Sequence, residues 1–240
     1  MLRILVLLAL LATAQAWGEI VPPGVTAKQL DDAVAHANAS MPEGDDRAAL
    51  LKSYADTRAA LSSFEQNRKQ IEMYLQSRAS AAKQAEAIED RLVALQNAPE
   101  QPVTVLKSSS LAAVEQAILV DKTDLDAKKA QLVDIQGQID GMTKRPTEIR
   151  ERIAELVLLS ADLKTQLELA GKKHASGSKE EAAYWLAEAQ LAGVAAEKAA
   201  LEEELLSQPM RLELLKAQHD KLSYEIAQIE KRAGAMAERA

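Results

Sequence analysis

Apolar side chains recur every three or four residues over most of the chain. The recurrence extends over residues 45–96, 111–170 and 191–236, and the first of these ranges contains neither proline nor glycine. This spacing places the apolar side chains along one stripe of an α-helix, whereas a half-buried β-strand alternates every second residue. The pattern therefore predicts an all-α fold of long antiparallel coiled-coil helices.

Residues 17–44 differ from the rest and predict a leader followed by a short helix. Thr26 is suited to cap a helix from about Ala27 to Ala39, and Met41-Pro42-Glu43-Gly44 interrupts it. Residues 45–240 then form the predicted helical domain. Its last helix begins at Ser178-Lys179-Glu180-Glu181, a capping box in which the Ser hydroxyl and the Glu181 carboxylate satisfy reciprocal backbone donors.

Two prolines, Pro146 and Pro209, fall inside the predicted helices. The apolar spacing of three and four residues keeps its phase across both prolines. Two separate helices joined by a turn have no reason to share a phase. We therefore expect three long arms that are kinked at the prolines. The alternative is a hairpin at each proline, which gives four to five shorter helices, because proline also suits a helix start.

The first sixteen residues predict a cleaved signal peptide. Arg3 supplies a positive charge, residues 4–11 are apolar, and Ala14-Gln15-Ala16 offers small residues for cleavage before Trp17. An uncleaved membrane anchor is the alternative, but the apolar run is shorter than the roughly 20 residues a spanning helix needs. The mature chain contains no other candidate membrane span, so we expect an exported protein.

Composition narrows the possible functions of the chain. Of its 240 residues 3% are aromatic, with 9 Gly, 7 Pro and no Cys. A sheet protein needs more aromatic residues in its strands and more Gly and Pro in its turns, so a sheet fold is disfavoured. The absence of Cys excludes disulfides and thiolate metal sites. The formal net charge of −7 argues against binding to nucleic acid, which requires clustered cations.

Residues with catalytic or ligand-binding chemistry are few. The three histidines, His36, His174 and His219, are never three or four residues apart, so metal-ligand spacing is absent. Residues 171–179 lack the spacing of a phosphate-binding loop. We therefore predict no catalytic, cofactor-binding or metal-binding residues, no cofactor, and no enzymatic activity.

Several polar and aromatic residues have two interpretations. Asp121 and Lys128 lie seven residues apart on the apolar stripe, either as a recognition pair for another helix or as a device that sets register. His219 lies on the last stripe, where register setting is again the plainer interpretation. Glu148 with Arg152 suggests a helix-supporting ion pair. The aromatic pair Tyr184-Trp185 either packs near the turn or marks a contact site.

Four stretches resemble a known family. They are LDDAVAHANASMPEGDDRAALLKSYADTRAAL at 30–61, LVALQNAPEQPVT at 92–104, KRPTEIRERIAEL at 144–156 and LEEELLSQPMRLELLKAQHDKLSYEIAQIEKR at 201–232. Their order resembles the porin-like periplasmic N-terminal domain of large MscS-type mechanosensitive ion channels. The resemblance covers nearly the whole mature chain, which lacks the membrane helices and vestibule of such channels, so no gating residue is carried over.

The resemblance implies a periplasmic structural or regulatory arm of a channel that releases solutes under membrane tension. Its implied partners are the channel's membrane domain, another protein of the cell envelope, or further copies of itself. The alternative is a freestanding periplasmic coiled-coil adaptor or chaperone. A chaperone needs accessible apolar surface, and the acidic, regularly patterned chain gives little sign of it.

Overall fold

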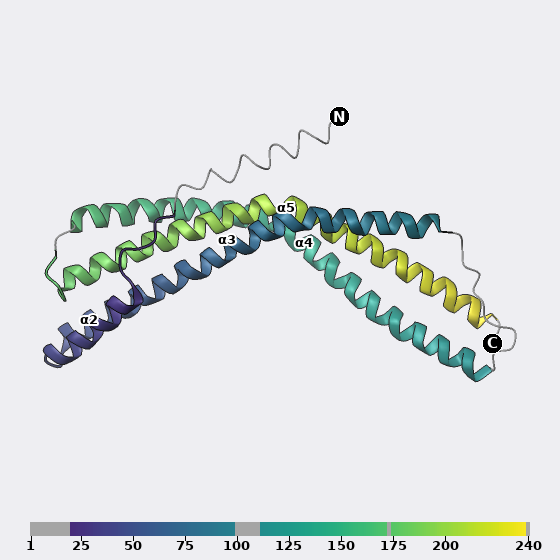
Figure 1. Ribbon diagram of the computed structural model, residues 1–240, viewed down its shortest axis with the longest axis horizontal. Coiled ribbons are helices and arrows are strands. Elements are labelled where there is room, and N and C mark those ends of the chain that lie inside the picture. Colours follow the sequence, from purple (N-terminus) through teal and green to yellow (C-terminus); the bar gives the residue numbers. More distant parts are fainter. Residues whose placement is uncertain (1–19, 99–110, 172–173, 239–240) are drawn as a thin grey trace, which may run out of the picture. The chain divides into compact units, whose positions relative to one another are not determined.

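The computed structural model describes residues 20–98, 111–171 and 174–238. In these ranges the chain forms four α-helices and no strand: α2 Ala27–Ser40, α3 Asp45–Asn97, α4 Leu111–Ala170 and α5 Lys179–Ala237 (Figure 1). The last three helices have 53, 60 and 59 residues. The all-α prediction is confirmed. The expected signal peptide, residues 1–16, lies outside the described residues, and the expected domain division stays a prediction.

Local capping explains where α2 and α5 begin. The Thr26 hydroxyl accepts a hydrogen bond from the Gln29 backbone N–H at 3.3 Å, and the Thr26 N–H donates to the Gln29 side chain at 2.8 Å. At α5 the Ser178 hydroxyl accepts from the Glu181 N–H at 3.1 Å. The Glu181 carboxylate, however, accepts from the Gly177 N–H at 2.6 Å, so the expected reciprocal contact moves by one residue.

Both prolines lie inside continuous helices. Pro146 is within α4 and Pro209 is within α5, so the hairpin alternative is wrong. Each proline removes one backbone hydrogen bond at a cost of about 3 kcal/mol, which packing along the uninterrupted apolar stripe has to offset. A bend of the helix axis at either proline stays a prediction.

The described residues divide into two compact units, and each long helix contributes to both. The first unit contains residues 20–74 and 149–204, and the second contains residues 75–148 and 205–238. In each unit α5 lies between α3 and α4 (Figure 1). Each unit therefore has the same three-helix order.

The core of the first unit joins α2 to the beginnings of α3 and α5. Tyr54, Leu30 and Leu50 are buried there against Trp185. On α4 the buried side chains are Ile149, Leu156 and Leu163, which follow one another at intervals of seven residues. Small alanine side chains on α5 allow the neighbouring helices to approach it closely. The buried alanines of α5 in this unit are Ala182, Ala187, Ala189, Ala192, Ala196, Ala199 and Ala200.

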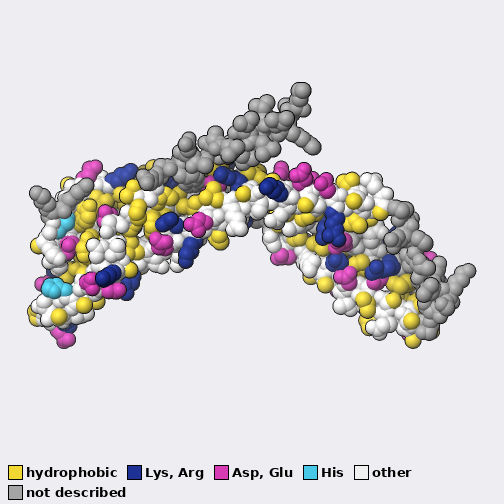
Figure 2. All heavy atoms as spheres, viewed as in Figure 1, with side chains coloured by type: hydrophobic (Ala, Val, Ile, Leu, Met, Phe, Trp, Pro, Cys, Tyr) yellow, Lys and Arg dark blue, Asp and Glu magenta, His cyan; other side chains and the backbone are white. Residues whose placement is uncertain are grey.

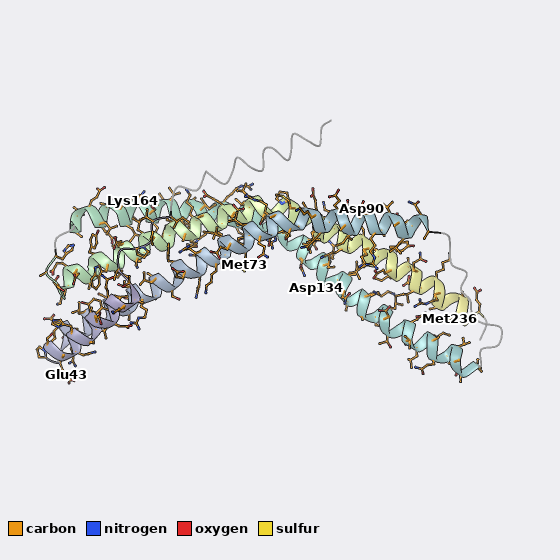
Figure 3. All side chains as sticks on the ribbon, viewed as in Figure 1. Glu43, Met73, Asp90, Asp134, Lys164 and Met236 are labelled. Carbon is orange, nitrogen blue, oxygen red and sulfur yellow. The ribbon has the colours of Figure 1, made fainter. Side chains whose placement is uncertain are left out.

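The second unit has a thinner core. Its buried apolar side chains come from all three long helices: Ala81 and Ala85 on α3, Val114 on α4, and Ala217, Ile226, Ile229 and Met236 on α5. The Tyr224 hydroxyl donates to the carbonyl of Leu95 at 3.1 Å, which joins α5 to the end of α3. Figure 3 draws the side chains that extend from the helices of each unit.

Cross-helix contacts define the helix directions. Lys179 of α5 pairs with Asp46 of α3, and the Asn67 side chain donates to the carbonyl of Gly193 at 3.4 Å, so residue numbers rise together along α3 and α5. Residue numbers rise along α4 as they fall along α5, as the pairs Lys128–Glu225 and Arg152–Glu197 show. Within each unit α4 is therefore antiparallel to α5.

Candidate interaction surface

Asp121 and Lys128 form ion pairs with α5. The Asp121 carboxylate, only 7% exposed, accepts from Arg232 Nε at 2.8 Å and also from its Nη2. Lys128 Nζ lies 2.8 Å from Glu225 Oε2. These hydrogen bonds raise the pKa of Arg232 and of Lys128. Both side chains therefore fix the register of α4 against α5, and no second molecule is needed to satisfy them.

Glu225 shows two opposing electrostatic effects. Burial raises the pKa of its carboxyl group, but the hydrogen bond and charge of Lys128, together with Lys221, outweigh burial, and the pKa is lowered. The carboxylate is therefore ionised at neutral pH. Lys129 and Glu230, 2.8 Å apart, add an exposed pair beside it.

Arg152 corrects the expected pairing of Glu148 with Arg152. Glu148 pairs with Arg145 at 3.2 Å, whereas Arg152 reaches Glu155 at 2.9 Å and Glu197 of α5 at 2.7 Å. Hydrogen bonds to Glu197 and Glu155 raise the pKa of the Arg152 guanidinium. Sequence spacing identifies possible partners on the same helix, whereas Glu197 comes within reach of Arg152 only because α4 packs against α5.

The aromatic pair Tyr184-Trp185 packs inward. The ring centroids of Trp185 and Tyr54 are 6.0 Å apart, and those of Tyr184 and His174 are 5.2 Å apart. Tyr54 is 1% exposed, and its hydroxyl has no hydrogen-bond partner among the residues that the structure describes. Burial and, secondarily, the charge of Glu181 raise the pKa of Tyr54. Trp185 therefore belongs to the core contacts of the first unit.

The three histidines make separate local contacts. His174 Nε2 lies 2.8 Å from the carbonyl oxygen of Gly171, and His219 Nδ1 lies 3.2 Å from the Asp220 carboxylate. The His36 ring lies beside Gly177. In the part of the chain that the structure describes, no three His, Asp or Glu side chains are grouped to hold a metal ion.

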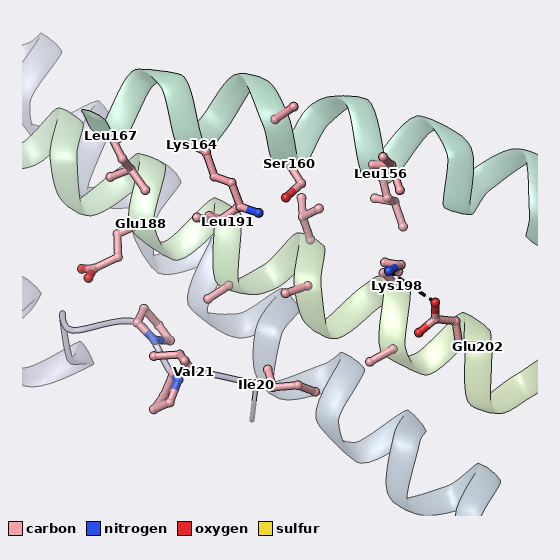
Figure 4. Close-up of a pocket in the computed structure, with 18 of the residues that line it drawn as sticks. Ile20, Val21, Leu156, Ser160, Lys164, Leu167, Glu188, Leu191, Lys198 and Glu202 are labelled. Atoms are coloured by element: carbon pink, nitrogen blue, oxygen red, sulfur yellow. Dashed lines mark ion pairs between the residues drawn. The ribbon is translucent and has the colours of Figure 1, made fainter. Parts of the chain in front are cut away.

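An open groove of about 800 Å³ lies between α4 and α5 in the first unit (Figure 4). Leu156, Ser160 and Leu167 of α4 and Leu191 of α5 line it, and Ile20–Pro23 of the leader lies along another side. The Lys198–Glu202 ion pair, 3.4 Å, lies at its edge. A second groove of about 470 Å³ lies between α3, α4 and α5.

Between these grooves α4 presents an apolar ridge, Val157, Leu158 and Leu159. Leu156, directly before it, is fully buried, whereas Leu158 is 70% exposed. Apolar side chains are also interspersed with charged ones on the face shown in Figure 2. From the sequence we expected little accessible apolar surface, and the exposed ridge corrects this expectation. Other exposed large apolar side chains of α4 are Leu111, Leu119, Val120, Val133 and Leu169.

None of the described helices combines the length and the apolar character needed to cross a membrane. The exposed apolar side chains are separated by charged residues, as in the ridge, which Glu155 precedes and Asp162 follows. This surface is consistent with binding another protein.

The chain matches a known family. The family model described as the mechanosensitive ion channel porin domain matches residues 34–240. No significant match was found among curated proteins or among solved structures.

Proposed function

The chain belongs to the mechanosensitive ion channel porin domain family, and we propose that it is an exported, non-enzymatic helical module serving as an interaction arm of a mechanosensitive channel. The single observation that carries this proposal is the family match over residues 34–240. It agrees with the resemblance found in the sequence. We place the arm in the periplasm and expect a channel membrane domain or another copy of the chain as its partner.

The packing supports a structural role for the arm. Asp121–Arg232, Lys128–Glu225 and Arg152–Glu197 tie α4 to α5 at intervals along both helices. Sliding of one helix along the other separates these opposite charges and exposes buried Asp121, which costs free energy. A pair of helices held in register in this way transmits an axial load with little slippage.

The ridge Val157–Leu159 is the surface that we assign to the partner. Its side chains are contiguous, exposed and flanked by grooves, and the core uses only their neighbour Leu156. Burying an exposed leucine in an interface contributes about 1.5–3 kcal/mol, so three adjacent apolar residues are a substantial contact.

Patch recording tests the function directly. The tension threshold for channel opening is compared between cells that make the chain, cells that lack it, and cells that make Leu158→Glu. We expect the threshold to change on deletion and the Leu158→Glu variant to reproduce that change. Gln131→Glu, an added charge at another exposed position of α4, is the control and should behave as the unaltered chain. An identical threshold with and without the chain refutes the proposal.

The exposed ridge also suits the alternative of a periplasmic adaptor or chaperone. An aggregation assay separates the two functions, because a chaperone suppresses aggregation of an unfolded client and a channel arm does not. We expect no suppression by the purified chain. Suppression that is lost in Leu158→Glu favours the chaperone.

A further inference from the structure

The groove between α4 and α5 of the first unit has a mostly apolar lining. Two of its valines, Val21 of the leader and Val157 of α4, are 72% and 50% exposed. The α5 residues that line it extend from Tyr184 to Glu202, about 27 Å at 1.5 Å per residue. Small side chains that recur every three or four residues leave room along this length: Ala192, Ala195 and Ala199. An elongated groove of this kind suits a flexible alkyl chain.

Two polar side chains of α4 enter the groove side by side. Ser160 and Lys164 lie four residues apart and therefore on the same face of the helix, and both point into the groove (Figure 4). Within residues 20–98, 111–171 and 174–238, neither side chain has a hydrogen-bond or ion-pair partner. A hydroxyl and an ammonium group together offer the hydrogen-bond donors that a carboxylate accepts, one of them charged.

The other charged side chains of the groove are directed elsewhere. Lys198 Nζ lies 3.4 Å from the Glu202 carboxylate. Glu188 points away from Lys164 (Figure 4), and its carboxylate oxygens lie against the leader, 3.2 Å from where a Cβ atom at Gly24 would be. Among the described residues that line the groove, Lys164 is therefore the cation open to a ligand, which favours a ligand with a negative charge.

We propose that this groove binds a long-chain carboxylate, the anion of a fatty acid. The Ser160 hydroxyl and the Lys164 ammonium group hold the carboxylate, and the alkyl chain lies along Leu191 and Ala195 of α5. Burial of the alkyl chain supplies affinity, because each buried methylene strengthens binding by about fourfold. A neutral or cationic amphiphile gains the same burial but leaves the Lys164 charge without a partner.

Fatty-acid binding uses a different surface from the ridge, so it goes beyond the proposed function and does not rest on it. Val157 belongs to both surfaces, but Leu158, which is 70% exposed, is not part of the groove lining. Leu158→Glu should therefore disturb the contact made by the ridge and leave fatty-acid binding unchanged. Loss of fatty-acid binding in this variant overturns the assignment to the groove.

Isothermal titration calorimetry of the purified protein with sodium dodecanoate, below its micelle-forming concentration, tests the binding. We expect one bound dodecanoate per chain. Decanoate and octanoate should bind more weakly, by about fourfold for each methylene removed. Absence of dodecanoate binding, or affinities that do not depend on chain length, overturn the inference.

Ligands that share a decyl chain test the headgroup. Decanol and decyltrimethylammonium should each bind about tenfold more weakly than decanoate, or weaker still, because neither can pair with the Lys164 ammonium group. Equal affinities show that any apolar chain adsorbs, and they overturn the inference. Decyl phosphate carries the phosphate monoester of a phospholipid headgroup; tighter binding of decyl phosphate than of decanoate assigns the groove to a phospholipid and overturns the carboxylate.

Matched variants locate the site. Lys164→Met removes the charge of an exposed side chain and should weaken dodecanoate binding by about tenfold, whereas Lys144→Met, at an exposed position of α4 outside the groove, should leave it unchanged. Ala195→Glu places a negative charge in the groove at an exposed position of α5 and should abolish binding. Ala227→Glu, at an exposed position of α5 outside the groove, is its control. With helicity retained by circular dichroism, unchanged binding in Lys164→Met or in Ala195→Glu overturns the inference.

Discussion

The buried hydroxyl of Tyr54 predicts that Tyr54→Phe stabilises the protein. This side chain is 1% exposed, and the centroid of its ring lies 6.0 Å from that of Trp185. Within the described part of the chain its hydroxyl has no hydrogen-bond partner. An unpaired buried hydroxyl costs about 1–3 kcal/mol, and phenylalanine keeps the ring without that cost. We therefore expect the free energy of unfolding to rise by about 1–3 kcal/mol.

Thermal and urea unfolding, followed by circular dichroism, measure this change. For a chain of this size each kcal/mol raises Tm by about 2–4 °C. Tyr184→Phe is the control, because Tyr184 is only partly buried, and it should alter the free energy of unfolding by less than about 0.5 kcal/mol. A Tyr54→Phe variant that is less stable than the unaltered protein refutes the reasoning.

The same substitution has a defined pH dependence. Burial first, and the charge of Glu181 second, raise the pKa of Tyr54 above its ordinary value of 10.0. Below that value the side chain is protonated in both the folded and the unfolded states. As the pH rises above it, the unfolded chain loses the proton first, so the free energy of unfolding falls until the folded pKa is passed. Tyr54→Phe removes this loss, and its advantage should therefore grow above pH 10.

Three further substitutions test the packing, each by urea unfolding. Leu156→Ala should lower the free energy of unfolding by about 2–5 kcal/mol, because Leu156 is buried. Leu158→Ala should lower it by less than about 0.5 kcal/mol, because Leu158 is 70% exposed. Equal effects of the two substitutions contradict the assigned core. A double-mutant cycle on Asp121→Asn and Arg232→Ala should give a coupling energy of about 1 kcal/mol, because the Arg232 side chain is 50% exposed and water screens its charge. Zero coupling contradicts the role of this pair in setting the register. Gly177→Ala should cost about 1–2 kcal/mol because φ is +74° there, and a neutral result contradicts the turn geometry.

Helix existence and helix ends could be predicted from the sequence because local rules decide them. Thr26 caps α2 through its own hydroxyl, and Gly171, with φ of +72°, ends α4 in the backbone conformation that favours glycine. The phase of the apolar residues across Pro146 and Pro209 correctly indicated that both helices continue. Phase reflects packing along the whole helix, and for that reason it outweighed the local preference of proline.

Partners across helices could not be predicted in the same way. Arg152 has Glu148 and Glu155 within helical reach, and only the packing of α4 against α5 selects Glu197 in addition. Burial on two sides of α5 was also missed, because alanine gives a weak apolar pattern around the helix. Apolar spacing alone also overestimates burial, since Leu75, Leu95 and Leu111 lie within the periodic ranges and are nevertheless exposed.

The exposed ridge of α4 connects this gap in prediction to the proposed function. A run of four apolar residues, 156–159, covers more than one face of a helix, and the chain itself buries only the first. Isolated exposed leucines are ordinary on protein surfaces, but contiguous ones beside two grooves reduce solubility unless something covers them. The antiparallel pairing with α5 requires only Leu156, so Val157–Leu159 are free to vary without loss of the fold. Their apolar character is therefore best explained by a contact outside the chain, as expected of an interaction arm.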